Sequence, residues 1–234
     1  MKKLILITIC SALLGPICDA TIGTEKPSSK ETEHITVTVL YDNYIFTKGL
    51  KSDWGFSCIL KGTKKNILFD TGTKGELLLD NIEKLKVDPK DVEVIVISHN
   101  HGDHTGGLLS FLKKNCDVSI YLPPSCPDSF IQELKGTGAK VLVTDAPIEI
   151  CKGVYLTGPM GERVIEQSMI VDTAEGVVII TGCSHPGIMN IVRKSKAILP
   201  RDVHLVFGGF HLLHKSEHEL KGIIDEFKKF GVKR

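Results

Sequence analysis

The residues best suited to chemistry lie in one short run, residues 99–104, which contains three histidines and one aspartate. Imidazole nitrogens and carboxylate oxygens are ligands for zinc and related divalent metals. Side chains of an extended segment repeat every second residue, so His99 and His101 can share one ion. Asp103 and His104 then lie in the following turn and can reach a second ion. The run predicts a site for one or two zinc ions rather than a solvated histidine-rich turn.

Two later histidines stand in similar settings, each after an apolar stretch that ends in glycine. His185 lies in the segment GCSHPG (residues 182–187), and His211 follows the segment GGF (residues 208–210). Both are predicted to be metal ligands, and the alternative for each is a histidine that caps a loop through hydrogen bonds. Cys183 lies at the same strand end as His185. The sequence leaves open whether it supplies a thiolate ligand or is a small buried thiol.

Asp70 is a further carboxylate at the end of an apolar stretch, in the segment LFDTG (residues 68–72). It can orient a metal-bound histidine from outside the ligand set, or it can cap a turn, and the two roles are compatible. Three glycines, Gly102, Gly106 and Gly107, follow or interrupt the histidine run. They are expected to let the backbone crowd together there without a side-chain clash.

The elements that must position these residues follow from hydrophobic periodicity. Strands are predicted at residues 35–41, 56–60, 66–69, 92–97, 118–121, 140–143, 168–171, 177–181 and 204–207. Helices are predicted at residues 75–85, around 108–112, and at 125–134, 188–199 and 217–230. The candidate ligands fall where strands end. Hairpins mixed with strand–helix units predict two sheets covered by helices, an α/β architecture in one domain of residues 35–234.

The N-terminal residues have the pattern of a cleavable secretory signal. Lys2 and Lys3 precede an apolar run at residues 4–14, Gly15 and Pro16 break it, and residues 18–20 offer small residues to a signal peptidase. The run is too short to span a bilayer comfortably, although an uncleaved membrane anchor is the alternative. Residues 1–20 are therefore expected to be a signal peptide and 21–34 a flexible lead-in. The mature protein is expected to be secreted or periplasmic, with no stable membrane span.

Composition narrows the class of partner. The chain has a formal charge of +1, and after its first residues it has no basic run, so we expect no nucleic-acid partner. We expect a small-molecule substrate, and the sequence does not indicate an oligomeric state. Beyond residue 20 the cysteines are odd in number and none are closely spaced, so no disulfide pairing can be assigned: Cys58, Cys116, Cys126, Cys151 and Cys183.

The order of these motifs resembles the metallo-β-lactamase superfamily. The motifs are LFDTG at residues 68–72 and SHNHGDHTGG at residues 98–107. The segments GCSHPG and GGFHL are similar to one branch, named for dihydropterin–ribofuranosylaminobenzene phosphate synthase. The resemblance extends from about residue 35 to the end and implies an αββα sandwich with a two-zinc site along one edge. It also implies the metal ligands His99, His101, Asp103 and His104, together with His185 and His211 from the branch's own motifs.

Two departures from the family pattern concern the second ion. The superfamily usually places a metal-bridging aspartate after a middle strand, and here Cys183 stands at about that place. Chains of the branch usually continue past the final segment GVKR into a strand with another histidine. Either the gene is truncated, or a second ion is held by fewer protein ligands. We therefore expect one well-held ion, with the second ion in question.

The resemblance implies an enzyme that uses metal-activated water for hydrolysis or a related transfer, and the signal-like N-terminus implies that this enzyme is exported. Asp103 would orient or deprotonate that water as well as bind metal. A true β-lactamase is one alternative, and a non-catalytic metal-binding protein with an incomplete second site is another. A di-iron oxygen-reducing enzyme fits less well, because that class has glutamate where His101 stands.

Overall fold

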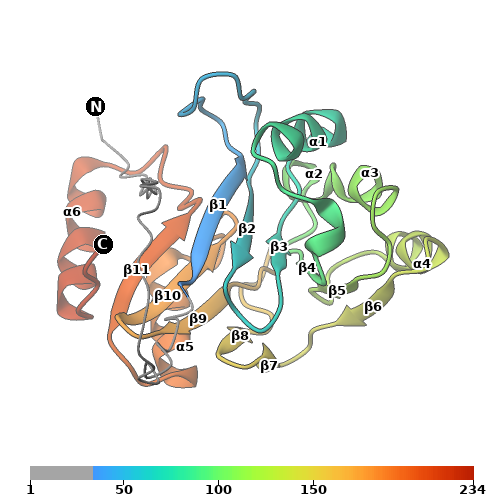
Figure 1. Cartoon of the computed structure of the whole chain (residues 1–234). Coiled ribbons are helices and arrows are strands. Elements are labelled where there is room, and N and C mark those ends of the chain that lie inside the picture. The colour runs from blue at the N-terminus through green and yellow to red at the C-terminus, as the bar shows by residue number, and fades with distance from the viewer. Residues whose placement is uncertain (1–33) are drawn as a thin grey trace, which may run out of the picture. The chain divides into compact units, whose positions relative to one another are not determined.

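The computed structural model describes residues 34–234, which form two β-sheets packed face to face with helices on both outer sides (Figure 1). The predicted αββα sandwich is confirmed. The expected signal peptide and all but the last residue of the expected lead-in lie outside the described residues. No helix within residues 34–234 is long and apolar enough to cross a membrane.

The first sheet has six strands in chain order and carries the helices of the N-terminal half. Its strands are β1 (Thr36–Tyr41), β2 (Ser57–Lys61), β3 (Ile67–Phe69), β4 (Val94–Val96), β5 (Ser119–Leu122) and β6 (Lys140–Val143). Strands β1 to β3 pair antiparallel, whereas β3 to β6 pair parallel. Between them lie α1 (Gly75–Lys84), a short 3-10 helix (Pro89–Asp91), α2 (Gly102–Thr105), α3 (Leu108–Leu112) and α4 (Asp128–Gly136).

The second sheet is formed by the C-terminal half. Its spatial order is β11 (Val203–Gly208), β10 (Gly176–Thr181), β9 (Met169–Thr173), β8 (Val154–Leu156) and β7 (Ile148–Cys151). Only β10 and β11 pair parallel, because α5 (Ile188–Ile198) connects them as a crossover. The last helix, α6 (Glu217–Lys229), begins with a capping box formed by Ser216 and Glu219.

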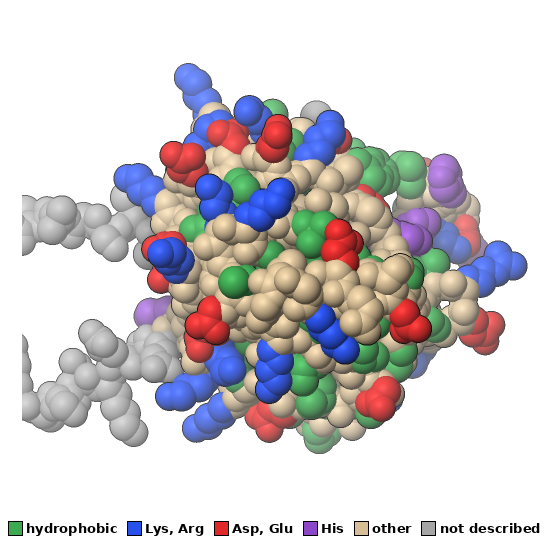
Figure 2. All heavy atoms as spheres, turned by 90° about the vertical axis from the view of Figure 1, so that its right-hand side faces the viewer, with side chains coloured by type: hydrophobic (Ala, Val, Ile, Leu, Met, Phe, Trp, Pro, Cys, Tyr) green, Lys and Arg blue, Asp and Glu red, His purple; other side chains and the backbone are tan. Residues whose placement is uncertain are grey.

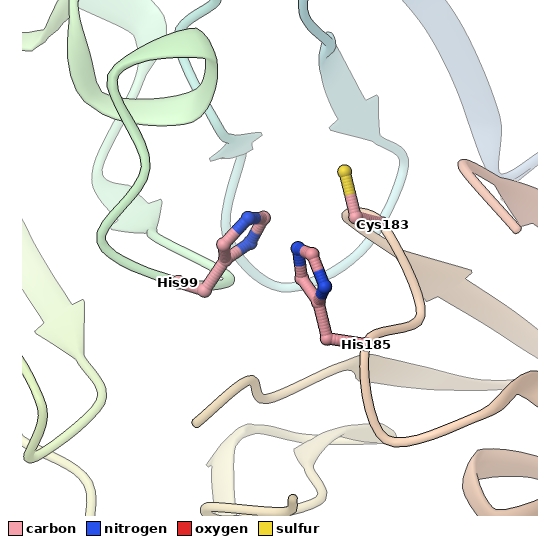
Figure 3. Close-up of side chains that lie close together, drawn as sticks. All are labelled: His99, Cys183 and His185. Carbon is pink, nitrogen blue, oxygen red and sulfur yellow. The ribbon is translucent and has the colours of Figure 1, made fainter. Parts of the chain in front are cut away.

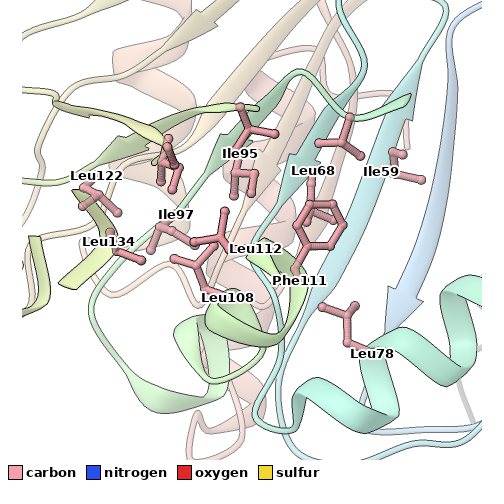
Figure 4. Packing of buried hydrophobic residues seen from close by; sticks show 14 of the residues in the cluster. Ile59, Leu68, Leu78, Ile95, Ile97, Leu108, Phe111, Leu112, Leu122 and Leu134 are labelled. Carbon is pink, nitrogen blue, oxygen red and sulfur yellow. The ribbon is translucent and has the colours of Figure 1, made fainter. Parts of the chain in front are cut away.

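Alternating side chains of the central strands separate the core into layers. In β3 and β4, Leu68 and Ile95 point towards the helices and pack with residues such as Phe111 (Figure 4). Their neighbours Phe69 and Val96 point the other way, into the layer between the two sheets. Side chains of β9 and β10 also alternate: those on one face join the layer between the two sheets, and those on the other face form a third cluster under α5. The continuous apolar strands expected from the sequence are therefore buried on both faces.

Two strands were missed by the sequence prediction. Strands β7 and β8 form a short hairpin at one edge of the second sheet, and Ile148 is exposed. Strands this short and partly exposed give a weak periodic signal. Helix α2, which starts just after His101, was expected only as a turn.

On the face shown in Figure 2, Lys and Arg side chains are interspersed with Asp and Glu. Within the described residues, every cysteine is free: Cys58, Cys116, Cys126, Cys151 and Cys183.

Candidate metal centre

The candidate ligands lie on loops that follow three strands of the two sheets. The loop after β4 carries His99 and leads into α2, while the loops after β10 and β11 carry His185 and His211. The ring centroids of His99 and His185 lie 4.8 Å apart, and those of His185 and His211 are also 4.8 Å apart. The centre thus draws side chains from both sheets.

One group of potential ligands consists of His99, Cys183 and His185. Their ligand atoms all lie within 4.8 Å of one another. Figure 3 shows His99 on one loop, facing Cys183 and His185 on the other. His101 joins this group from the side, since its Nδ1 lies 3.1 Å from Nε2 of His99. Two imidazole nitrogens that face each other at this distance are suitably placed to share a metal ion.

A second group consists of Asp103, His104 and Cys183, again with ligand atoms within 4.8 Å of one another. Nε2 of His104 lies 3.1 Å from Sγ of Cys183 and 3.5 Å from Oδ2 of Asp103. Cys183 belongs to both groups and so stands between them. His211 is exposed and lies beside His185, outside both three-residue groups.

Asp70 fixes the orientation of both buried histidines. Its Oδ2 accepts a hydrogen bond from Ser98 Oγ at 2.7 Å and lies 2.6 Å from Nδ1 of His104. Because the Ser98 hydroxyl donates to a carboxylate, its oxygen accepts from Nδ1 of His99, which lies 2.9 Å away. Both imidazoles therefore carry a proton on Nδ1 and direct Nε2 into the centre. The sequence suggested that Asp70 orients a candidate histidine ligand, and Asp70 makes such a contact with His104.

The same contacts perturb the titration of the candidate ligands. Burial, followed by the charges of neighbouring histidines, lowers the pKa of His99 to about 2 and that of His185 to about 4. Burial also acts to lower the pKa of His104, but the charge of Asp70 and hydrogen bonds to Asp103 and Asp70 raise it to about 12. The hydrogen bond to His104 lowers the pKa of Asp103 to about 2. His99 and His185 are thus neutral, with lone pairs free for a metal.

The glycines around α2 differ in their role. A Cβ on Gly106 would collide with the carbonyl oxygen of Thr73, and one on Gly107 with the carbonyl oxygen of Thr71. These two glycines permit the close approach expected from the sequence. At Gly102 a Cβ would meet nothing within 4 Å, so the expectation of crowding was wrong there.

Sequence reasoning missed Glu166 and Gln167, which support the two ligand loops from beneath. Glu166 is buried, and its carboxylate accepts hydrogen bonds from the backbone N–H groups of residues 182–185. Burial raises the pKa of Glu166, and these hydrogen bonds partly offset that effect. The only signal in the sequence is a charged residue and an amide just before the apolar strand β9.

The donor set fits a metal ion. Among residues 34–234, the buried Nε2 of His185 has no hydrogen-bond partner, and a buried polar atom left unpaired costs about 1–3 kcal/mol. Coordination would satisfy this atom. The surrounding nitrogen, sulfur and carboxylate donors are those that zinc takes in proteins.

Comparison with known proteins places the chain in a family. A family model described as the metallo-beta-lactamase superfamily matches residues 55–186. The 7,8-dihydropterin-6-methyl-4-(beta-D-ribofuranosyl)-aminobenzene-5'-phosphate synthase of Methanocaldococcus jannaschii is 31% identical, over 87% of this chain and 86% of that protein. A second protein of that archaeon, of uncharacterised function, is 27% identical over 82% of this chain and 85% of its own length.

A solved structure agrees with these matches. The crystal structure of a metal-dependent hydrolase of the beta-lactamase superfamily is 31% identical, with a TM-score of 0.70 and 85% of each chain covered. The motif order, the αββα sandwich and the clustered candidate ligands at the strand ends all agree with this family. The chain belongs to the metallo-β-lactamase superfamily.

Proposed function

We propose that this chain is a zinc-dependent enzyme that cleaves or transfers a group of a small-molecule substrate with metal-activated water. The observation that supports this most is the pair of three-residue ligand groups that share Cys183. The superfamily to which the chain belongs usually binds metal ions, and the related synthase and the related hydrolase are both enzymes by description.

The ligands we propose are those that the loops bring together. His99, His101 and His185 would hold one ion, and Asp103 and His104 would hold a second, with the thiolate of Cys183 shared between them. His211 lies beside His185 and would be a further ligand on the exposed side of the metal centre. Because His104 is protonated when no metal is bound, it must release its Nε2 proton to act as a ligand.

Zinc held by these residues would lower the pKa of a bound water from about 16 to about 7, which would make hydroxide available at neutral pH, and it would polarise the substrate oxygen. Asp103 is partly exposed beside His104, so its carboxylate can accept a hydrogen bond from the attacking water. Asp103 would orient or deprotonate that water as well as bind metal. Asp70 and Ser98 hold the imidazoles of His104 and His99 in place.

The class of reaction can be tested with the full chain. The zinc-loaded protein should hydrolyse at least one member of a panel of esters, thioesters, lactones and phosphoesters, and Asp103→Asn should lower kcat at least tenfold. Turnover of nitrocefin in place of that panel would assign the β-lactamase alternative. Bound metal with no turnover of any compound would support a non-catalytic metal-binding protein.

A second candidate activity comes from the related synthase, whose match covers most of both chains. Its description names a 5'-phosphate synthase that forms a dihydropterin joined to a ribofuranosylaminobenzene. The test incubates the zinc-loaded protein with the ribofuranosylaminobenzene 5'-phosphate and a dihydropterin that carries a leaving group on its 6-methyl carbon. Mass spectrometry then looks for the coupled product, which forms as the arylamine nitrogen displaces the leaving group and loses a proton. Formation of the coupled product would assign this activity in preference to hydrolysis.

We also propose that the protein is exported, on the strength of the signal-like pattern in residues 1–20. Protein recovered from outside the cytoplasm should begin at Thr21. Recovery of the intact N-terminus from the cytoplasm alone would contradict export.

A further inference from the structure

The carboxylate of Glu166 holds the loop that carries Cys183 and His185. Its Oε1 accepts from the backbone N–H groups of Gly182, Cys183 and Ser184 at 3.0–3.1 Å. Its Oε2 accepts from the backbone N–H of His185 at 2.8 Å. The side chain is 1% exposed. Consecutive N–H groups that converge in this way form a concave anion-binding surface, and here a side chain of the protein itself fills it.

The next residue, Gln167, makes equivalent contacts with the other ligand loop. Its backbone N–H donates to the carbonyl oxygen of Ser98 at 2.9 Å, and its Nε2 donates to that of Ile97 at 2.8 Å. Both partners directly precede His99 in the chain. Two consecutive buried residues thus bind the loop from the first sheet and the loop from the second.

We infer that Glu166 and Gln167 form a positioning element that sets the separation of His99 from Cys183 and His185, and through it the affinity of the metal centre. This inference rests on the proposed metal centre. Neither residue belongs to the potential ligand groups, so both act through the loops. Glu166 is suited to this role because every one of its loop partners is a donor and a carboxylate only accepts.

Glu166→Gln is the sharpest variant because it conserves size and replaces one acceptor oxygen with an NH2 donor. Either orientation of the amide sets that donor against at least one backbone N–H of the loop. The loop must then move, although the side chain still fills the same space. Leu134→Ala serves as the control: this buried residue of α4 belongs to the core cluster between the first sheet and its helices. It reports what a general loss of stability does to metal binding.

The experiment titrates each full-length, metal-free protein with Co2+ and follows the thiolate-to-cobalt absorption in the near ultraviolet, which reports coordination by Cys183. Outer partners of metal ligands typically change affinity by about 10–100-fold. We expect Glu166→Gln to raise the Kd for cobalt by about that factor and to weaken the thiolate band per bound ion. Leu134→Ala should keep the parent Kd and band while losing thermal stability.

The outcomes separate this inference from the proposed function. A parent protein that binds no cobalt overturns the proposed metal centre. A parent that binds cobalt, together with a Glu166→Gln protein of unchanged Kd and spectrum, overturns the positioning role alone. So does a Leu134→Ala protein that loses as much affinity as Glu166→Gln. If Glu166→Gln is insoluble, Glu166→Asp, whose shorter side chain cannot reach all the donors, is measured with the same criteria.

Discussion

At the scale of single residues, Asp70 determines which nitrogen of each buried histidine faces the metal centre. Its carboxylate accepts from the Ser98 hydroxyl and binds Nδ1 of His104, and Ser98 in turn accepts from Nδ1 of His99. Imidazoles fixed in this tautomer present Nε2 without the entropic cost of ring rotation at the moment of binding. One carboxylate thus prepares a ligand in each of the two groups.

The serine in this network can be tested by comparison with a matched neighbour. Ser98→Ala removes the partner of His99 and should weaken zinc binding by about 10–100-fold in a competitive chelator titration. Ser57 is also buried, but its hydroxyl donates to the backbone carbonyl of Asp70. Ser57→Ala should lower stability by about 1 kcal/mol and leave zinc affinity unchanged. Equal zinc affinities for the two variants would contradict the role given to Ser98.

Zinc binding should depend on pH through His104. Its pKa of about 12 means that, at neutral pH, the ligand carries a proton that the metal must displace, so affinity rises as pH rises. His99 and His185, with pKa values of about 2 and 4, are already neutral and release no proton. Calorimetry in buffers of different ionisation enthalpy should detect the His104 proton released at pH 7, in addition to the proton that the Cys183 thiol loses when it binds as a thiolate. Asp70→Asn removes the charge that raises the pKa of His104, so this variant should release fewer protons than the parent when zinc binds. Equal proton release by the two proteins would contradict the assignment to His104.

At the scale of elements, the strand ends and Gly106, which directly follows α2, determine where the candidate ligands lie. Strand β4 delivers His99, and the loop after β10 delivers Cys183 and His185. Gly106 lets α2 lie directly against the backbone of Thr73. The geometry of the centre therefore depends on the packing of backbone segments as much as on the ligands themselves.

Two glycine substitutions on this short helix should have opposite outcomes. Gly106→Ala forces a Cβ against the carbonyl of Thr73 and should cost about 1–3 kcal/mol of unfolding free energy. The Cβ added by Gly102→Ala would lie in open space, so this substitution should change the free energy of unfolding by less than about 1 kcal/mol. Urea denaturation of the metal-free proteins measures both. A Gly106→Ala protein as stable as the parent would show that α2 does not need this close contact.

The sequence predicts those parts of the fold and site that have a local pattern. Long apolar strands and the spacing of His99 to His104 are such patterns, and they led to the sandwich and the ligand run. The hairpin of β7 and β8 is too short and exposed to give a strong signal. Glu166 could not be assigned a role, because its partners are backbone N–H groups that every residue but proline has.

At the scale of the whole molecule, the proposed metal centre joins the two sheets. His99, His101, Asp103 and His104 follow a strand of the first sheet, whereas Cys183, His185 and His211 follow strands of the second. The inner core also joins the sheets, through apolar contacts. Under our inference, Glu166 and Gln167 add polar contacts that bind the two ligand loops to each other.

The content of tightly bound zinc tests the central claim most directly. We predict that the full-length protein keeps one or two zinc ions per chain after dialysis against metal-free buffer, measured by elemental analysis. Cys183→Ala, which removes the donor common to both groups, should bind zinc more weakly and keep fewer ions than the parent. A parent protein that retains no zinc, or a Cys183→Ala protein with the zinc content and affinity of the parent, would contradict the account.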